Sequence, residues 1–76
     1  MSVEEYTKEK LWEILIETAH RLVMYPYHKA YTRDVILHEK PEITSAELVV
    51  RLNMPLGEAL IILHELAEEK KESKIA

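Results

Sequence analysis

The chain has 76 residues, 47% of them hydrophobic, and a formal net charge of −4. This length predicts a single domain, residues 1–76, with a thin core that a partner chain would help to complete. The absence of cysteine excludes disulfides and thiolate chemistry, and the acidic balance argues against a general nucleic-acid coat. The charged amino terminus and the lack of a long apolar run predict a cytoplasmic protein without membrane contact.

A long amino-terminal helix is expected over residues 3–25. Ser2 and Glu5 have the spacing of a capping box. Pro26 disfavours helical geometry in the residue before it, so the helix is expected to end near Tyr25. An apolar stripe at i, i+3, i+4 spacing is typical of such a helix, and consists of Leu11, Trp12, Leu15, Ile16, Ala19, Leu22 and Val23.

Residues 25–31 are expected to form a connector, and Thr32 to cap a short helix from Arg33 to about Lys40. A second capping box, Thr44 with Glu47, predicts a third helix over residues 45–52.

A fourth helix is expected from about Pro55 to Lys71, because proline suits the first turn of a helix. Residues 73–76 should form a frayed or short extended tail. No strand is well signalled, since nothing alternates with period two between turn residues. The expected fold is therefore an all-α, compact bundle of about four helices.

Residues 32–72 resemble the helix-turn-helix core of the winged-helix families. The resemblance is carried by the segments RDVILHEK, TSAELVVRL, NMP and LGEALIILHELAEE. It implies a helix-turn-helix-like core and, in most small proteins of this fold, DNA binding. No glycine follows Gly57 and the chain ends soon afterwards, so the wing is expected to be absent or vestigial. Another compact three-helix bundle would produce the same apolar spacing.

The surface of the fourth helix does not suit DNA. On a helical wheel Ile61 lies opposite the expected core face, near His64, and Leu60 lies at the margin of that face. A DNA-reading helix presents basic or amide side chains to the major groove. Here the outer face carries isoleucine and glutamates, so Leu60, Ile61 and His64 are the expected protein-interaction residues. The alternative is a lone exposed isoleucine without a function.

The connector interleaves bases with aromatic residues. Cations can hold phosphates while aromatic rings stack on bases. Tyrosines that cover the core with their hydroxyls in water, or a protein interface, would explain the same composition. The candidate nucleic-acid residues are Arg21, Tyr27, Lys29 and Arg33, with Arg51 elsewhere in the chain.

No residues indicate catalysis. The chain has no glycine-rich phosphate loop, and its three serines lie near the ends or in a capping turn. His64 and Glu68 have metal-ligand spacing, but a solvated surface pair is the simpler interpretation. No cofactor, metal or small-molecule substrate is therefore expected. Abundant Glu and Lys without Gln or Cys are typical of thermophile proteins.

The leading hypothesis is a non-catalytic interaction module. It would be a small helix-turn-helix-like subunit or adaptor that docks on a protein partner or on itself as an oligomer, within a DNA-processing or transcription complex. The alternative is a DNA-binding transcriptional regulator, which would contact nucleic acid through the basic residues named above.

Overall fold

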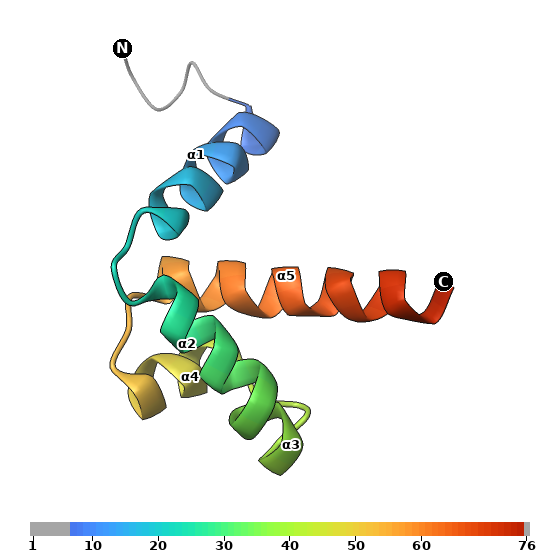
Figure 1. Cartoon of the computed structure of the whole chain (residues 1–76). Coiled ribbons are helices and arrows are strands. Elements are labelled where there is room, and N and C mark those ends of the chain that lie inside the picture. Colours follow the sequence, from blue (N-terminus) through green and yellow to red (C-terminus); the bar gives the residue numbers. More distant parts are fainter. Residues whose placement is uncertain (1–6, 76) are drawn as a thin grey trace.

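The computed structural model describes the backbone of residues 7–75 and the side chains of residues 7–71. The regular elements in this part of the chain are all helical. The elements are α1 (Lys8–His20), α2 (Tyr25–Tyr31), the π-helical turn η2 (Thr32–Ile36), α3 (Leu37–Glu39), α4 (Ser45–Leu52) and α5 (Leu56–Ile75) (Figure 1). Because α2, η2 and α3 follow one another without a break and form one helical segment, the predicted all-α bundle of about four helices is confirmed.

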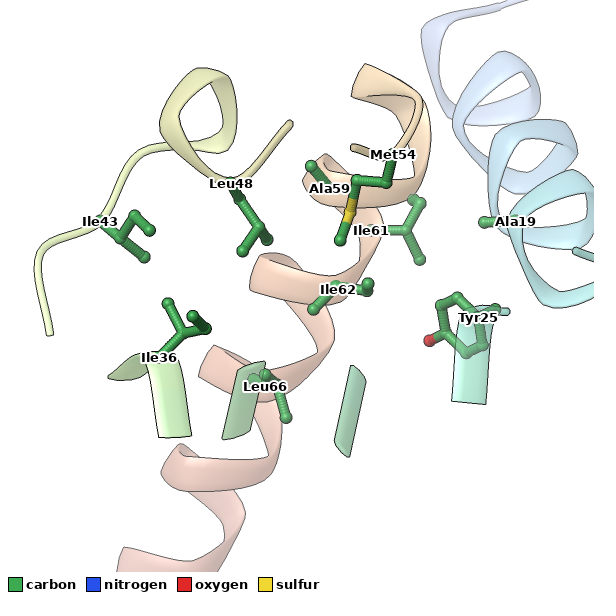
Figure 2. Close-up of a cluster of buried hydrophobic side chains, with 10 residues drawn as sticks. All are labelled: Ala19, Tyr25, Ile36, Ile43, Leu48, Met54, Ala59, Ile61, Ile62 and Leu66. Carbon is green, nitrogen blue, oxygen red and sulfur yellow. The ribbon is translucent and has the colours of Figure 1, made fainter. Parts of the chain in front are cut away.

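Helix α5 is the central element of the fold. It packs against α4, against α1 and against α2, and Figure 1 shows α1 and α4 on different sides of its first half. A helix covered on more than one side must be apolar on more than one side, and α5 buries Ala59, Ile61, Ile62 and Leu66. Around them lie the other buried apolar residues, Ala19, Tyr25, Ile36, Ile43, Leu48 and Met54 (Figure 2).

The first helix is shorter than predicted. The proposed cap at Ser2 and Glu5 lies outside the described residues, and α1 ends at His20 rather than near Tyr25. In an unbroken helix the ring of Pro26 would clash with the carbonyl of the residue four positions earlier. The chain therefore turns before Pro26, which lies in the first turn of α2, where a helix tolerates proline.

The predicted connector is itself a helix, so that part of the prediction is wrong. Residues 25–31 form α2, and the helical path continues to Glu39. Thr32 is not a cap: it is buried, and its hydroxyl donates to the His28 carbonyl oxygen at 2.7 Å. The hydroxyl is satisfied within the helix, which explains how a threonine with the right sequence context for a cap can lie mid-helix.

Local signals placed α4 correctly. Thr44 and Glu47 form the predicted capping box, and α4 spans Ser45–Leu52 as expected. Asn53 ends the helix in the left-handed conformation (φ 53°), which asparagine tolerates better than most residues.

The predicted tail is wrong, because α5 continues to Ile75. The carboxy-terminal sequence is rich in Ala, Glu and Lys and has no proline or glycine after Gly57. These residues have high helix propensity, so nothing local stops the helix where its apolar pattern ends.

The capping box makes a testable contribution to acid stability. A hydrogen bond from the Lys40 side chain, followed by hydrogen bonds from the Thr44 backbone and hydroxyl, lowers the pKa of Glu47 from 4.5 to about 2. Because the folded-state pKa is depressed, this stabilisation is present above pH 4.5 and is lost as the pH falls towards 2.

We therefore expect Glu47→Gln to flatten the loss of unfolding free energy between these two pH values. Thr44→Ala removes the hydroxyl, one of the three hydrogen-bond donors to the Glu47 carboxylate, and keeps the backbone N–H, so it should flatten the slope in part. Urea unfolding at a series of pH values measures the slope, and an unchanged slope in Glu47→Gln would show that other carboxylates set the acid dependence.

Candidate protein-interaction surface

The predicted contact residue Ile61 is not on the surface. Its exposed fraction is 0%, and Figure 2 shows its side chain on the side of α5 that faces Ala19 of α1 and Tyr25 of α2. The prediction of exposure is wrong because α1 and α2 cover the face of α5 that a helix-turn-helix core alone would leave open. A partner therefore cannot reach Ile61 in this conformation.

Two of the glutamates expected to face solvent on α5 instead tie helices together, whereas Glu68 is exposed as expected. Glu58 is buried, and its Oε2 accepts a hydrogen bond from His28 Nδ1 of α2 at 2.6 Å. Glu65 Oε2 lies 2.8 Å from His20 Nε2 at the end of α1. Each pair fixes a helix against α5, so these acids belong to the structure rather than to an acidic outer face.

The other two predicted contact residues remain accessible. Leu60 is partly exposed, and His64 lies on the surface with its ring edge-on to Trp12 of α1 at a centroid distance of 5.2 Å. The two residues are one turn apart on α5, so they lie on one row beside α1. Leu56, one turn before Leu60, is also exposed and extends this row.

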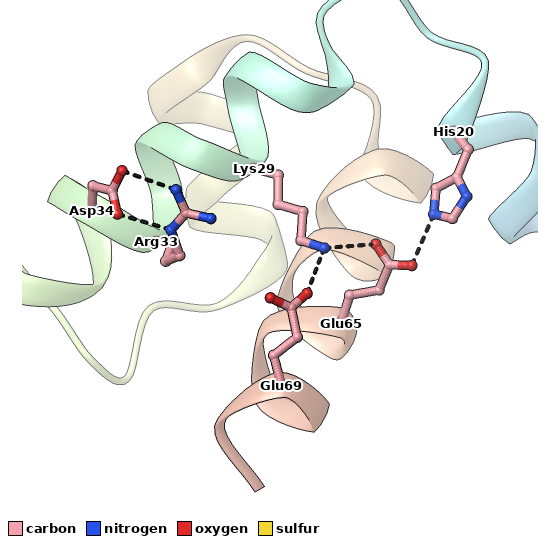
Figure 3. A network of polar contacts seen from close by, with 6 residues as sticks. All are labelled: His20, Lys29, Arg33, Asp34, Glu65 and Glu69. Atoms are coloured by element: carbon pink, nitrogen blue, oxygen red, sulfur yellow. Dashed lines mark hydrogen bonds and ion pairs between the residues drawn. The ribbon is translucent and has the colours of Figure 1, made fainter. Parts of the chain in front are cut away.

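The candidate nucleic-acid cations are already paired with carboxylates. Lys29 Nζ lies 2.5 Å from Glu69 Oε2 and 3.5 Å from Glu65 Oε1 on α5 (Figure 3). The latter oxygen has no hydrogen-bond partner, so its contact with Lys29 is an ion pair without hydrogen-bond geometry. Lys29 thus bridges two acids of the central helix.

Arg33 pairs with its neighbour in sequence. Its Nε and Nη2 donate to the two carboxylate oxygens of Asp34 at 2.8 and 3.1 Å (Figure 3). The hydrogen bond to Asp34 raises the pKa of Arg33, and the same bond lowers the pKa of Asp34. Arg51 pairs with Glu39, and Arg21 lies 3.8 Å from Glu17. A phosphate would have to compete with a carboxylate at each of these four cations.

The aromatic residues of the same segment lie on another face. Tyr27 is 67% exposed, and Tyr31 is also exposed. At about 100° per residue, Lys29 lies about 160° around α2 from Tyr27, whereas Met24 and Tyr31 lie within about 60° of it. The sequence interleaves bases with aromatics, but the helix separates them. Tyr25 differs from both, because it is buried with its hydroxyl unpartnered among the described residues.

Sequence reasoning missed two members of this exposed apolar face. The apolar spacing predicts Val23 in the core stripe, yet it is 84% exposed, and it predicts no role for Met24, which is also exposed. The stripe was extended through a helix that ends at His20, so its periodicity no longer applies after that residue. The signal that would have found them is Pro26, whose ring forbids a helix across the preceding turn. We name Val23, Met24, Tyr27 and Tyr31 the α2 outer face.

No protein-family model, curated protein or solved structure matches the chain. In residues 7–75, no helix is long and apolar enough to cross a membrane. Residues 7–71, whose side chains are described, contain no group of three or more His, Asp or Glu placed to hold a metal ion.

Proposed function

We propose that this protein is a non-catalytic interaction module, a small subunit or adaptor that docks on a protein partner through the α2 outer face. The observation that carries the proposal is the exposure of four large apolar side chains within residues 23–31. Tyrosine and methionine are enriched at protein interfaces, where an aromatic side chain contributes a large contact area at a low entropy cost.

The arrangement of α4 and α5 supports a helix-turn-helix-like core. The two helices pack together and are joined by residues 53–55. However, α1 and α2 cover the face of α5 that a recognition helix would insert into the major groove. Within a DNA-processing or transcription complex, such a core serves docking on a protein component better than base readout.

The alternative, a DNA-binding regulator, is supported by the order of the helices alone. Nucleic-acid affinity comes mainly from lysine and arginine side chains that neutralise phosphates. Arg21, Lys29, Arg33 and Arg51 each lie beside a carboxylate, which offsets their charge. The DNA-binding hypothesis therefore ranks second.

The test places a photoreactive phenylalanine analogue at position 27 or at position 50 of the full chain. Val50 is the matched control, because it is 83% exposed but lies on α4. Irradiation in the native cell extract should yield a protein adduct of discrete mass from position 27 and none from position 50. Competition by the unlabelled wild-type chain, but not by a Tyr27→Asp variant, should remove the adduct. Equal adducts from both positions, or adducts only with nucleic acid, would contradict the proposal.

A further inference from the structure

Helix α1 carries a second apolar stripe that faces away from the core. Leu11 and Ile14 are 38% and 39% exposed. At about 100° per residue, the midpoint between them lies about 110° around α1 from the buried Ala19. Thr7 and Thr18 continue the stripe at its two ends, which gives a spacing of four, three and four residues along the helix.

The threonines of this stripe have no unmet hydrogen-bonding need. Thr7 Oγ1 accepts from the Lys10 backbone N–H at 3.1 Å, and Thr18 Oγ1 donates to the Ile14 carbonyl oxygen at 2.9 Å. Both hydroxyls are satisfied inside α1, so a partner can cover them without a large desolvation cost. The alternating four- and three-residue spacing is the seam spacing of helices that pair side by side.

We propose that α1 pairs with α1 of a second copy of this chain, antiparallel across a two-fold axis, so that Leu11 of each copy packs against Ile14 of the other. A two-fold contact uses the same patch on both copies and closes as a dimer, whereas a head-to-tail contact would continue into a chain. This self-association uses a surface separate from the α2 outer face and does not depend on it.

The flanking charges select the antiparallel orientation. Lys10 and Glu17 lie on the same side of the stripe, towards its opposite ends. A two-fold axis perpendicular to the helices brings this side of one copy onto the same side of the other with the direction reversed. Lys10 of each copy then lies opposite Glu17 of the other.

A parallel pair would instead place this charged side against the opposite side of the stripe, where Leu15 lies. Within one chain, Lys10 and Glu17 make only weak contacts with oppositely charged side chains. Lys10 lies 3.8 Å from Glu13, Glu17 lies 3.8 Å from Arg21, and all four side chains are exposed.

The apolar surface continues from α1 onto α5. A Cβ on Gly57 would lie only 2.8 Å from Leu15 Cδ1, so the two helices touch at this glycine. Leu56 and Leu60, the exposed leucines of α5, flank Gly57 along the helix. Leu60, which the sequence indicated as a contact residue, thus lies beside the proposed dimer seam. A seam of α1's length, about 20 Å, is short, so we expect a dimer with a Kd of roughly micromolar to tens of micromolar.

Sedimentation equilibrium of the full chain tests the proposal. Between about 1 µM and about 1 mM the average mass should rise from the monomer mass of 8.9 kDa towards twice that value. Ile14→Arg should weaken dimerisation at least about tenfold while leaving the helical circular dichroism intact, and Val50→Arg should change nothing. A mass that stays at the monomer value, or an Ile14→Arg variant that dimerises like the wild type, would overturn the proposal.

A charge exchange tests the orientation in the same measurement. Lys10→Glu and Glu17→Lys should each weaken the dimer several-fold, and the double variant should recover the wild-type Kd to within about twofold. Because the chain has no cysteine, Thr7→Cys and Thr18→Cys chains provide a second readout. Mixed chains should form a disulfide between positions 7 and 18, whereas disulfides formed only between identical positions would refute the antiparallel arrangement. The photocrosslinking at position 27 reports on another face, so failure of either proposal is distinguishable.

Discussion

Replacing Ile61 with alanine is expected to lower the free energy of unfolding by about 3 kcal/mol, because truncating a fully buried isoleucine loses its transfer free energy and leaves a cavity. For a chain of this size, whose stability is roughly 4–11 kcal/mol, that is a large fraction. The matched control is Leu60→Ala, one residue away and partly exposed, which should cost about 1 kcal/mol.

Comparing the unfolding free energies of the two variants in urea tests whether α1 and α2 cover the Ile61 side of α5. Equal costs at the two sites would mean that nothing covers the Ile61 side of α5. The burial also means that an Ile61→Arg variant would not test association selectively. Such a variant should unfold the protein rather than disturb its association selectively, because an arginine side chain would be buried without a partner.

Removing the partner of Glu58 is expected to have a similarly large effect. In His28→Ala, the buried Glu58 carboxylate loses its 2.6 Å hydrogen bond from the imidazole, and no other described side chain bonds it. Leaving a buried carboxylate without its hydrogen-bond donor costs about 3 kcal/mol.

A double variant separates this cause from a simple loss of packing. His28→Ala with Glu58→Met removes the buried charge together with its partner, and should recover most of the lost stability. Thermal and urea unfolding of the single and double variants measure the coupling. If the double variant is no more stable than His28→Ala, the carboxylate is not the source of the cost.

Those parts of the fold that depend on neighbours in sequence could be predicted. The α4 bounds followed from the Thr44–Glu47 capping box, in which both partners lie within one turn. The predicted end of the first helix near Tyr25 was wrong, although its signal, Pro26, was recognised. The clash of a proline ring acts one turn upstream, so the break falls before Tyr25 rather than at it.

The burial of Ile61 could not be derived from the wheel of α5 alone. That wheel has apolar residues on two sides, and only the position of α1 and α2 decides that both are covered. The same is true of the charges. Lys29 pairs with Glu65 and Glu69, which lie more than thirty residues away in sequence. The connector therefore offers a partner less positive charge than its sequence indicates. Leu60 and His64 do lie at the surface, as the helical wheel of α5 predicts.

An amide NMR titration of the labelled full chain with a mixed-sequence DNA duplex at low salt most directly separates a protein-docking module from a DNA-binding one. If the cations are held by carboxylates as described, the amides of Lys29, Arg33 and Arg51 should not shift when the duplex is added. Shifts at these residues that vanish as salt is added would show phosphate neutralisation and would contradict the proposed function.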